Sequence, residues 1–112
     1  MVLVADDESA VRRLVALALA ARGFVPLEAR NGLEAVELYA SYRSAIVLVV
    51  TDLDMPVMDG FEAIDRIREI SPGVRAVLMS GAMRECRIPD YPFLPKPFTL
   101  AQLMERVQRA LA

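Results

Sequence analysis

The stretch A-I-V-L-V-V-T-D-L-D-M-P-V-M-D-G, from Ala45 to Gly60, decides the fold of this chain. Apolar residues, mostly β-branched, run from Ile46 to Val50, which is typical of a strand buried on both faces of a parallel sheet. Asp52 follows where that strand should end, and Pro56 cannot donate to a strand ladder. A helix-capping role for Asp52 is less favoured, because Asp59 already fills it. Asp52 is therefore expected at the carboxyl edge of the sheet, where open α/β sheets bind their ligands.

Strand-like and helix-like patterns alternate along the whole chain. The runs that predict strands cover residues 2–5, 24–28, 46–50, 75–79 and 91–94. Helices are expected to follow four capping residues: Ser9, Asn31, Asp59 and Thr99. The apolar sides of the second and last helices include Leu33 and Leu100. The alternation indicates a parallel sheet with right-handed crossovers and helices on both faces, in one domain spanning residues 1–112.

The composition is that of a globular domain, with 55% hydrophobic and 25% charged residues among 112. A net charge of −2 without a basic block argues against nucleic-acid binding by this domain. No apolar run reaches the ~18 residues of a membrane span, and the start M-V-L-V-A-D-D does not resemble a signal peptide. A single cysteine, Cys86, fits a reducing compartment, so a cytoplasmic location is expected. Because the chain has no histidine, any phosphohistidine must belong to another protein.

Polar side chains follow four of the predicted strands. Asp6 and Asp7 come after the first, Asp52 after the third, Ser80 after the fourth and Lys96 after the fifth. These strand ends share one edge of a parallel sheet, so the side chains should converge. Clustered carboxylates need a cation, and oxygen ligands without histidine or cysteine select a hard ion such as Mg²⁺. An anion that needs both Mg²⁺ and a lysine is most plausibly phosphoryl, and an aspartate can accept it as an aspartyl phosphate. Separate, solvated loop positions are the less probable interpretation.

Four motifs, in this order, resemble the response-regulator receiver domain of two-component signalling. They are V-A-D-D-E, T-D-L-D-M-P-V-M-D-G, L-M-S-G-A and F-L-P-K-P-F, and the resemblance covers the entire chain. It implies a flavodoxin-like, three-layer α/β/α fold with five helices and five parallel strands in the order 2-1-3-4-5. It also implies a phosphoacceptor signalling domain that assists its own phosphorylation and slow dephosphorylation, rather than an enzyme.

The resemblance also implies roles for the acidic residues. Asp52 would accept a phosphoryl group from the phosphohistidine of a sensor histidine kinase or a histidine phosphotransfer protein. Asp7 and Asp52 would bind Mg²⁺ through their carboxylates, and Asp6 would do so through water. The backbone carbonyl of Asp54 would be a further metal ligand.

Three residues outside the acidic group complete the implied site. Ser80 would bond one phosphoryl oxygen, and Lys96 would pair with another. Phe93 matches the switch aromatic of the family, although it lacks the hydroxyl of the tyrosine found in many members. Ser80 is followed by glycine where alanine is common. The family also has a cis bond at the position of Lys96-Pro97. We expect the response to phosphorylation to be concentrated between Gly81 and Phe93.

The connection between Ser80 and Lys96 is shorter than is usual in the family, at fifteen residues. Pro89 and Pro92 forbid a long helix there, so a shortened helix four is expected within 82–88. This puts in doubt the output and dimerisation role that the surface around helix four often has. The short connection, Ser80-Gly81 and F-L-P-K-P-F together are most similar to receivers attached to hybrid sensor kinases. Attachment to a larger kinase is therefore expected, with a weak homodimer as the alternative arrangement.

Two other functions stay open at this point. Asp52-Leu53-Asp54 after an apolar run also resembles the D-x-D of Mg²⁺-dependent haloacid-dehalogenase-type phosphohydrolases. Those enzymes usually carry the motif near the start of the chain, whereas here it lies in the middle. The second alternative is a binding module that has lost phosphorylation, and it is less favoured because all the expected side chains are present.

Overall fold

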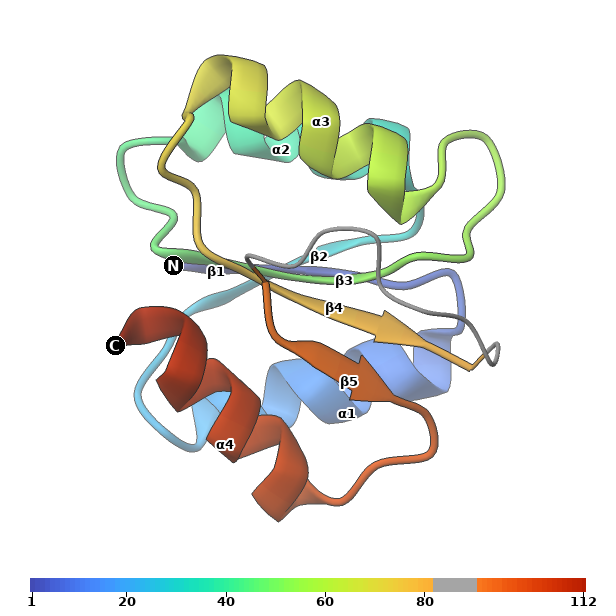
Figure 1. Ribbon diagram of the computed structural model, residues 1–112, viewed down its shortest axis with the longest axis vertical. Coiled ribbons are helices and arrows are strands. Elements are labelled where there is room, and N and C mark those ends of the chain that lie inside the picture. Colours follow the sequence, from blue (N-terminus) through green and yellow to red (C-terminus); the bar gives the residue numbers. More distant parts are fainter. Residues whose placement is uncertain (82–90) are drawn as a thin grey trace.

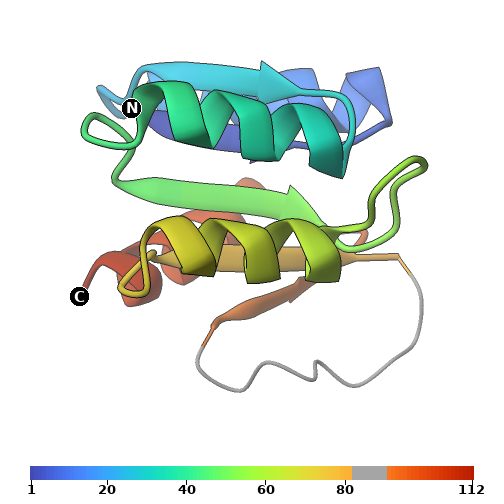
Figure 2. The same cartoon turned by 90° about the horizontal axis from the view of Figure 1, so that it is seen from above.

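A five-stranded parallel sheet forms the centre of the computed structural model, which describes residues 1–81 and 91–112 (Figure 1). The strand order is β2-β1-β3-β4-β5, as the resemblance implied. The strands are β1 (Val2–Ala5), β2 (Pro26–Ala29), β3 (Leu48–Asp52), β4 (Ala76–Ser80) and β5 (Phe93–Pro95). Viewed from above in Figure 2, their carboxyl ends share one edge of the molecule.

Helices cover both faces of this sheet. The described residues form α1 (Ser9–Ala20), α2 (Gly32–Tyr42), α3 (Gly60–Ile70) and α4 (Leu100–Leu111). In Figure 1, α2 and α3 lie on one face, and α1 and α4 lie on the other. The shortened helix expected within 82–88 falls outside the described residues, as does most of the segment in which we expect the response to phosphorylation.

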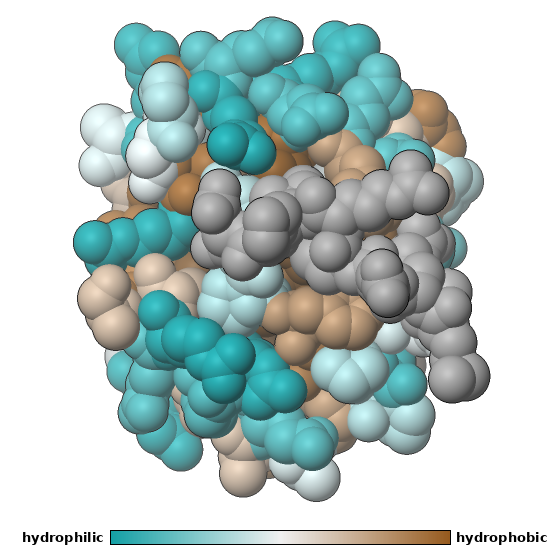
Figure 3. All heavy atoms as spheres, in the orientation of Figure 1, coloured by the Kyte–Doolittle hydropathy of each residue, from teal (hydrophilic) through white to brown (hydrophobic). Residues whose placement is uncertain are grey.

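Two hydrophobic cores result, one on each face of the sheet. Side chains alternate along each strand, so Leu3 and Val49 enter one core, whereas Val2 and Val50 enter the other. Figure 3 shows hydrophilic residues over the outer helices and apolar residues in the band between them. The expected apolar positions Leu33 and Leu100 are instead 42% and 53% exposed. Each lies in the first turn of its helix, beyond the reach of the core.

The central strand begins two residues later than the apolar run predicts. Ile46 is buried but lies outside the ladder, in which Val2 of β1 pairs with Leu48. Val47 also precedes the ladder and is 51% exposed, so the apolar run includes two residues that are not part of the strand and gave the wrong bounds. Asp52 is consequently the last residue of β3, where it pairs with Met79 of β4. The sheet itself therefore holds the Asp52 backbone.

Three of the other strands are displaced in the same direction, whereas β1 has the bounds that the sequence predicts. β4 includes Ser80, so this hydroxyl is also carried on a strand. β2 begins at Pro26, where an edge strand tolerates a missing N–H, and Phe24 instead donates its N–H to the carbonyl of Leu19 at the end of α1. β5 begins at Phe93 rather than at residue 91.

Three of the four predicted helix caps are confirmed. Asn31, Asp59 and Thr99 each accept a hydrogen bond from the backbone N–H three residues on, and Thr99 forms a reciprocal capping box with Gln102. The prediction for Ser9 is wrong, because Ser9 is already the first helical residue and Glu8 is the N-cap. The N–H of Glu8 donates to Asp6 Oδ1 (2.9 Å), so Asp6 fixes this turn before the helix begins.

Candidate functional site

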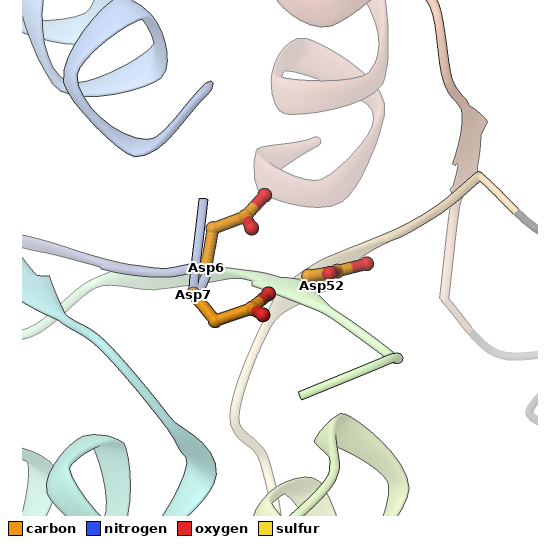
Figure 4. Close-up of side chains that lie close together, drawn as sticks. All are labelled: Asp6, Asp7 and Asp52. Atoms are coloured by element: carbon orange, nitrogen blue, oxygen red, sulfur yellow. The ribbon is translucent and has the colours of Figure 1, made fainter. Parts of the chain in front are cut away.

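Three aspartate carboxylates meet at the carboxyl edge of the sheet. Ala5 of β1 pairs with Thr51 of β3, so the residues that follow them, Asp6 and Asp52, lie side by side. Asp7 joins them, and one carboxylate oxygen of each aspartate lies within 4.8 Å of the other two. Figure 4 shows Asp6 and Asp7 at the end of β1 and Asp52 at the end of β3. The predicted convergence of these residues is confirmed.

Asp52 lies in an environment that disfavours its charge. Its side chain is nearly inaccessible, and among the described residues its Oδ1 atom has no hydrogen-bond partner. Burial and the negative charge of Asp6 raise the pKa of Asp52 from 3.8 to about 6, despite the opposing effect of Lys96. A buried anionic oxygen without a partner has the properties of a nucleophile or a metal ligand.

Lys96 is the cation of the site. Its Nζ lies 2.8 Å from Asp6 Oδ2, 3.4 Å from Asp52 Oδ2 and 3.4 Å from Glu8 Oε1. Burial opposes its charge, but the hydrogen bond to Asp6 and the nearby carboxylates outweigh burial and raise the pKa of Lys96. Lys96 is positioned by the sheet, because its backbone N–H donates to the carbonyl of Ser80 (2.9 Å). The Lys96-Pro97 peptide bond is cis, as the resemblance implied.

Ser80 lies at the same edge, at the end of β4. It is buried, and its Oγ donates to Asp54 Oδ2 at 2.8 Å. The carboxylate of Asp54 is therefore engaged with this hydroxyl and is not one of the three that meet around Asp52. Phe93 lies at the start of β5, opposite Leu78 of β4, and packs partly buried against a core.

The family model of the response regulator receiver domain matches residues 2–108. The chain belongs to this family. As a two-component phosphorelay receiver it is a phosphoacceptor signalling domain rather than a classical enzyme. Receiver domains bind Mg²⁺ at an acidic pocket, which corresponds to the group formed by Asp6, Asp7 and Asp52. The match favours neither the phosphohydrolase nor the binding module.

The curated relatives of this chain include larger proteins, of which it matches only a part, and a protein that it matches over nearly the whole length. Over 98% of its length it is 35% identical to the sensor kinase CckA of Brucella abortus (strain 2308), of which it spans 12%. It is likewise 35% identical, over 98% of its length, to the regulatory protein AtoC of Escherichia coli (strain K12), of which it spans 25%. It is 31% identical to the chemotaxis protein CheY of Bacillus subtilis (strain 168), with 98% of this chain and 96% of CheY covered.

Solved structures agree with the receiver fold. The receiver domain of the hybrid histidine kinase CckA superposes with a TM-score of 0.87 at 33% identity, covering 99% of this chain and 98% of that one. The CheX-CheY-BeF₃-Mg²⁺ complex from Borrelia burgdorferi gives 0.91 at 27% identity, covering 99% and 88%. Relatives of these kinds imply a histidine kinase or a phosphotransfer protein as the partner of a receiver.

The loop after Asp52 returns to the end of β3, where the first residue of α3, Gly60, contacts the backbone of Asp52 and Leu53. The N–H of Gly60 donates to the carbonyl of Leu53 (3.1 Å), and a Cβ at Gly60 would lie 2.2 Å from the carbonyl oxygen of Asp52. Only glycine permits this approach of α3 to the end of β3. Within the same loop, Val57 has a φ of 70°, which is unusual for a β-branched residue.

The sequence patterns did not predict three contacts at the receiver site. Glu8 contacts Lys96, and the Asp54 carboxylate accepts from Ser80. Arg12 of α1 donates to the backbone carbonyl of Asp6 (2.9 Å). Glu8 could have been noticed in V-A-D-D-E, because it directly follows two ligand candidates. The contacts of Asp54 and Arg12 depend on the packing of separate elements, for which the sequence carries no local signal.

Proposed function

We propose that Asp52 of this receiver accepts a phosphoryl group from the phosphohistidine of a sensor histidine kinase or a histidine phosphotransfer protein. The observation that carries the proposal is the buried Oδ1 of Asp52, which lies beside Lys96 and has no hydrogen-bond partner in the part of the chain that the structure describes. In the reaction, a carboxylate oxygen of Asp52 forms a bond to phosphorus with its own electron pair. The P–N bond breaks and its electron pair returns to the imidazole nitrogen, leaving an aspartyl phosphate.

The residues at the site fit a bound Mg²⁺. Hard oxygen ligands converge there, and one of them is a buried oxygen without a partner among the described residues. The carboxylates of Asp7 and Asp52, Asp6 through water and the backbone carbonyl of Asp54 would hold the ion. When bound, Mg²⁺ supplies positive charge that offsets the repulsion among the carboxylates and the charge of the phosphoryl oxygens.

Lys96 and Ser80 would bind the phosphoryl oxygens. Lys96 reaches the Asp52 carboxylate at 3.4 Å, so its ammonium needs only a small shift to pair with an oxygen on that group. Ser80 carries a hydroxyl on the neighbouring strand, and it would exchange its bond to Asp54 for one to the phosphoryl group. The movement of Ser80 would leave space that Phe93 fills, which gives Phe93 the role of a switch.

We also propose the setting in which the domain works. Residues 1–112 form one receiver domain, which acts in the cytoplasm and is attached to a larger kinase or forms a weak homodimer. It assists its own phosphorylation and slow dephosphorylation through Asp52, Ser80 and Lys96. Neither nucleic acid nor membrane is a partner of this domain. No helix in the described part of the chain has the length and apolar character required to cross a bilayer.

The test is phosphorylation by a small phosphodonor, such as acetyl phosphate, with Mg²⁺, followed by intact mass. Wild type should gain one phosphoryl group, and Asp52→Asn should gain none. Asp54→Asn is the matched control, because it changes a neighbouring aspartate while keeping the backbone carbonyl that would bind the metal, and it should still be labelled. Equal labelling of Asp52→Asn and wild type would refute the assignment.

A further inference from the structure

Arg12 contacts the peptide unit that joins two of the converging aspartates. It is the fourth residue of α1, and helical side chains point back toward the helix N-terminus. Its Nη1 donates to the carbonyl oxygen of Asp6 at 2.9 Å. That carbonyl belongs to the peptide unit between Asp6 and Asp7, so its orientation determines where the Asp7 side chain begins.

The guanidinium of Arg12 is itself held in place. Its Nε donates to Glu28 Oε1 of β2 at 3.1 Å, and its side chain is only 12% exposed. The two bonds use different nitrogens of one rigid, planar group, so they fix both its position and its plane. Arg12 therefore links β2, α1 and the turn that follows β1.

The same turn is fixed at two other points. The N–H of Asp6 donates to the carbonyl of Ala29 in β2 (3.1 Å), and Asp6 Oδ1 accepts from the N–H of Glu8 (2.9 Å). The carbonyl of the Asp6–Asp7 peptide unit, however, accepts only from Arg12 among the described residues, so losing Arg12 would leave that carbonyl without a donor there. The carboxylates carried on either side of that plane repel each other and Asp52, and this repulsion would rotate the plane.

We propose that Arg12 is a positioning residue for the divalent-cation site, acting through the Asp6 carbonyl to hold Asp6 and Asp7 in ligand geometry. The proposal rests on the proposed Mg²⁺ site. A metal ligand depends on outer contacts that orient it, and removal of such a contact typically weakens metal affinity 10- to 100-fold. Arg12 touches no carboxylate of the three, so its contribution comes from the orientation of the backbone.

Arg13 provides a matched control from the same helix. Its Nη1 pairs with Oε2 of the same Glu28 at 3.1 Å, but its side chain is 65% exposed, and no contact from it to Asp6 is found among the described residues. Arg12→Met and Arg13→Met therefore remove the same charge and the same kind of ion pair. Only the first removes the bond to the Asp6 carbonyl.

The experiment measures the Mg²⁺ dissociation constant of the full chain by titration calorimetry. Arg12→Met should raise that constant at least about tenfold, while Arg13→Met should change it less than about twofold. Arg12→Lys, which keeps the charge and can keep one of the two bonds, should restore part of the affinity. Amide hydrogen exchange without metal is the second readout: Arg12→Met should speed exchange at Asp6 and Glu8 but leave Val4 protected.

The possible results separate a failure of the Arg12 positioning role from a failure of the proposed metal site. Wild-type Mg²⁺ affinity in a folded Arg12→Met, or an equal loss in Arg13→Met, would overturn the positioning role. If Arg12→Met does not fold, Arg12→Lys is measured in its place, and unchanged affinity and exchange there overturn the role equally. If wild type itself binds no Mg²⁺, the proposed metal site fails, whereas exchange at Asp6 and Glu8 still decides whether Arg12 fixes the turn.

Discussion

At the scale of the residue, Asp52 shows how far environment changes an ordinary carboxylate. Burial and Asp6 raise its pKa to about 6, so the folded state holds a proton on Asp52 more tightly than the unfolded chain does. Protonation of Asp52 therefore stabilises the folded state. This stabilisation is fully present below the unfolded pKa of about 4 and is lost as the pH rises through the folded pKa of about 6. At neutral pH in the absence of metal, the ionised Asp52 destabilises the fold on which its chemistry depends.

Asp52→Asn should consequently stabilise the metal-free protein in a pH-dependent way. A shift of about two pKa units corresponds to a gain of up to about 3 kcal/mol in the free energy of unfolding at pH 7. The gain should shrink towards pH 4, where Asp52 is protonated in wild type. Denaturant unfolding at several pH values in EDTA measures it, and Asp65→Asn, at an exposed position on α3, is the control. A gain that does not depend on pH would contradict the raised pKa.

At the scale of the element, the strand ends are what bring the site together. The sequence predicted that Asp6, Asp52, Ser80 and Lys96 would converge, because parallel strands present their carboxyl ends at one edge. It did not predict that β3 and β4 extend far enough to include Asp52 and Ser80, because both residues are polar and an apolar pattern does not mark the polar end of a strand. It also misassigned the first helix cap, since a serine at a helix start resembles a cap whether or not it is one.

The junction between β3 and α3 gives a prediction at this scale. Gly60→Ala would push a methyl group against the carbonyl oxygen of Asp52, so it should lower the free energy of unfolding by about 3 kcal/mol or more. Gly73→Ala is the matched control, because a Cβ there meets nothing within 4 Å, and it should be neutral or slightly stabilising. Thermal or urea unfolding compares the two. Similar stability of both variants would show that α3 can move away from the strand end.

At the scale of the whole molecule, a hydrophobic core packs against each face of the sheet. The carboxyl edge of the sheet carries the aspartate carboxylates and the ammonium of Lys96. The parallel sheet, its layers and the position of the site followed from the alternation of strands and helices, whereas the strand order followed from the resemblance to the receiver family. The contacts of Arg12, Glu8 and the Asp54 carboxylate did not, because each joins side chains from separate elements whose distance is fixed only by packing. The sequence pattern therefore identifies the site residues at the strand ends, whereas the contacts between separate elements emerge only from the fold.

We propose that the carboxyl edge of the sheet serves to place a phosphoryl group on Asp52. The most direct measurement is treatment with acetyl phosphate and Mg²⁺, reduction of the acyl phosphate with borohydride, and peptide mass spectrometry. Reduction converts the phosphorylated aspartate to homoserine, so we expect homoserine at position 52 with Mg²⁺ and little of it with EDTA. Homoserine at Asp6, Asp7 or Asp54 instead, or at no aspartate, would refute the assignment of Asp52 as the acceptor.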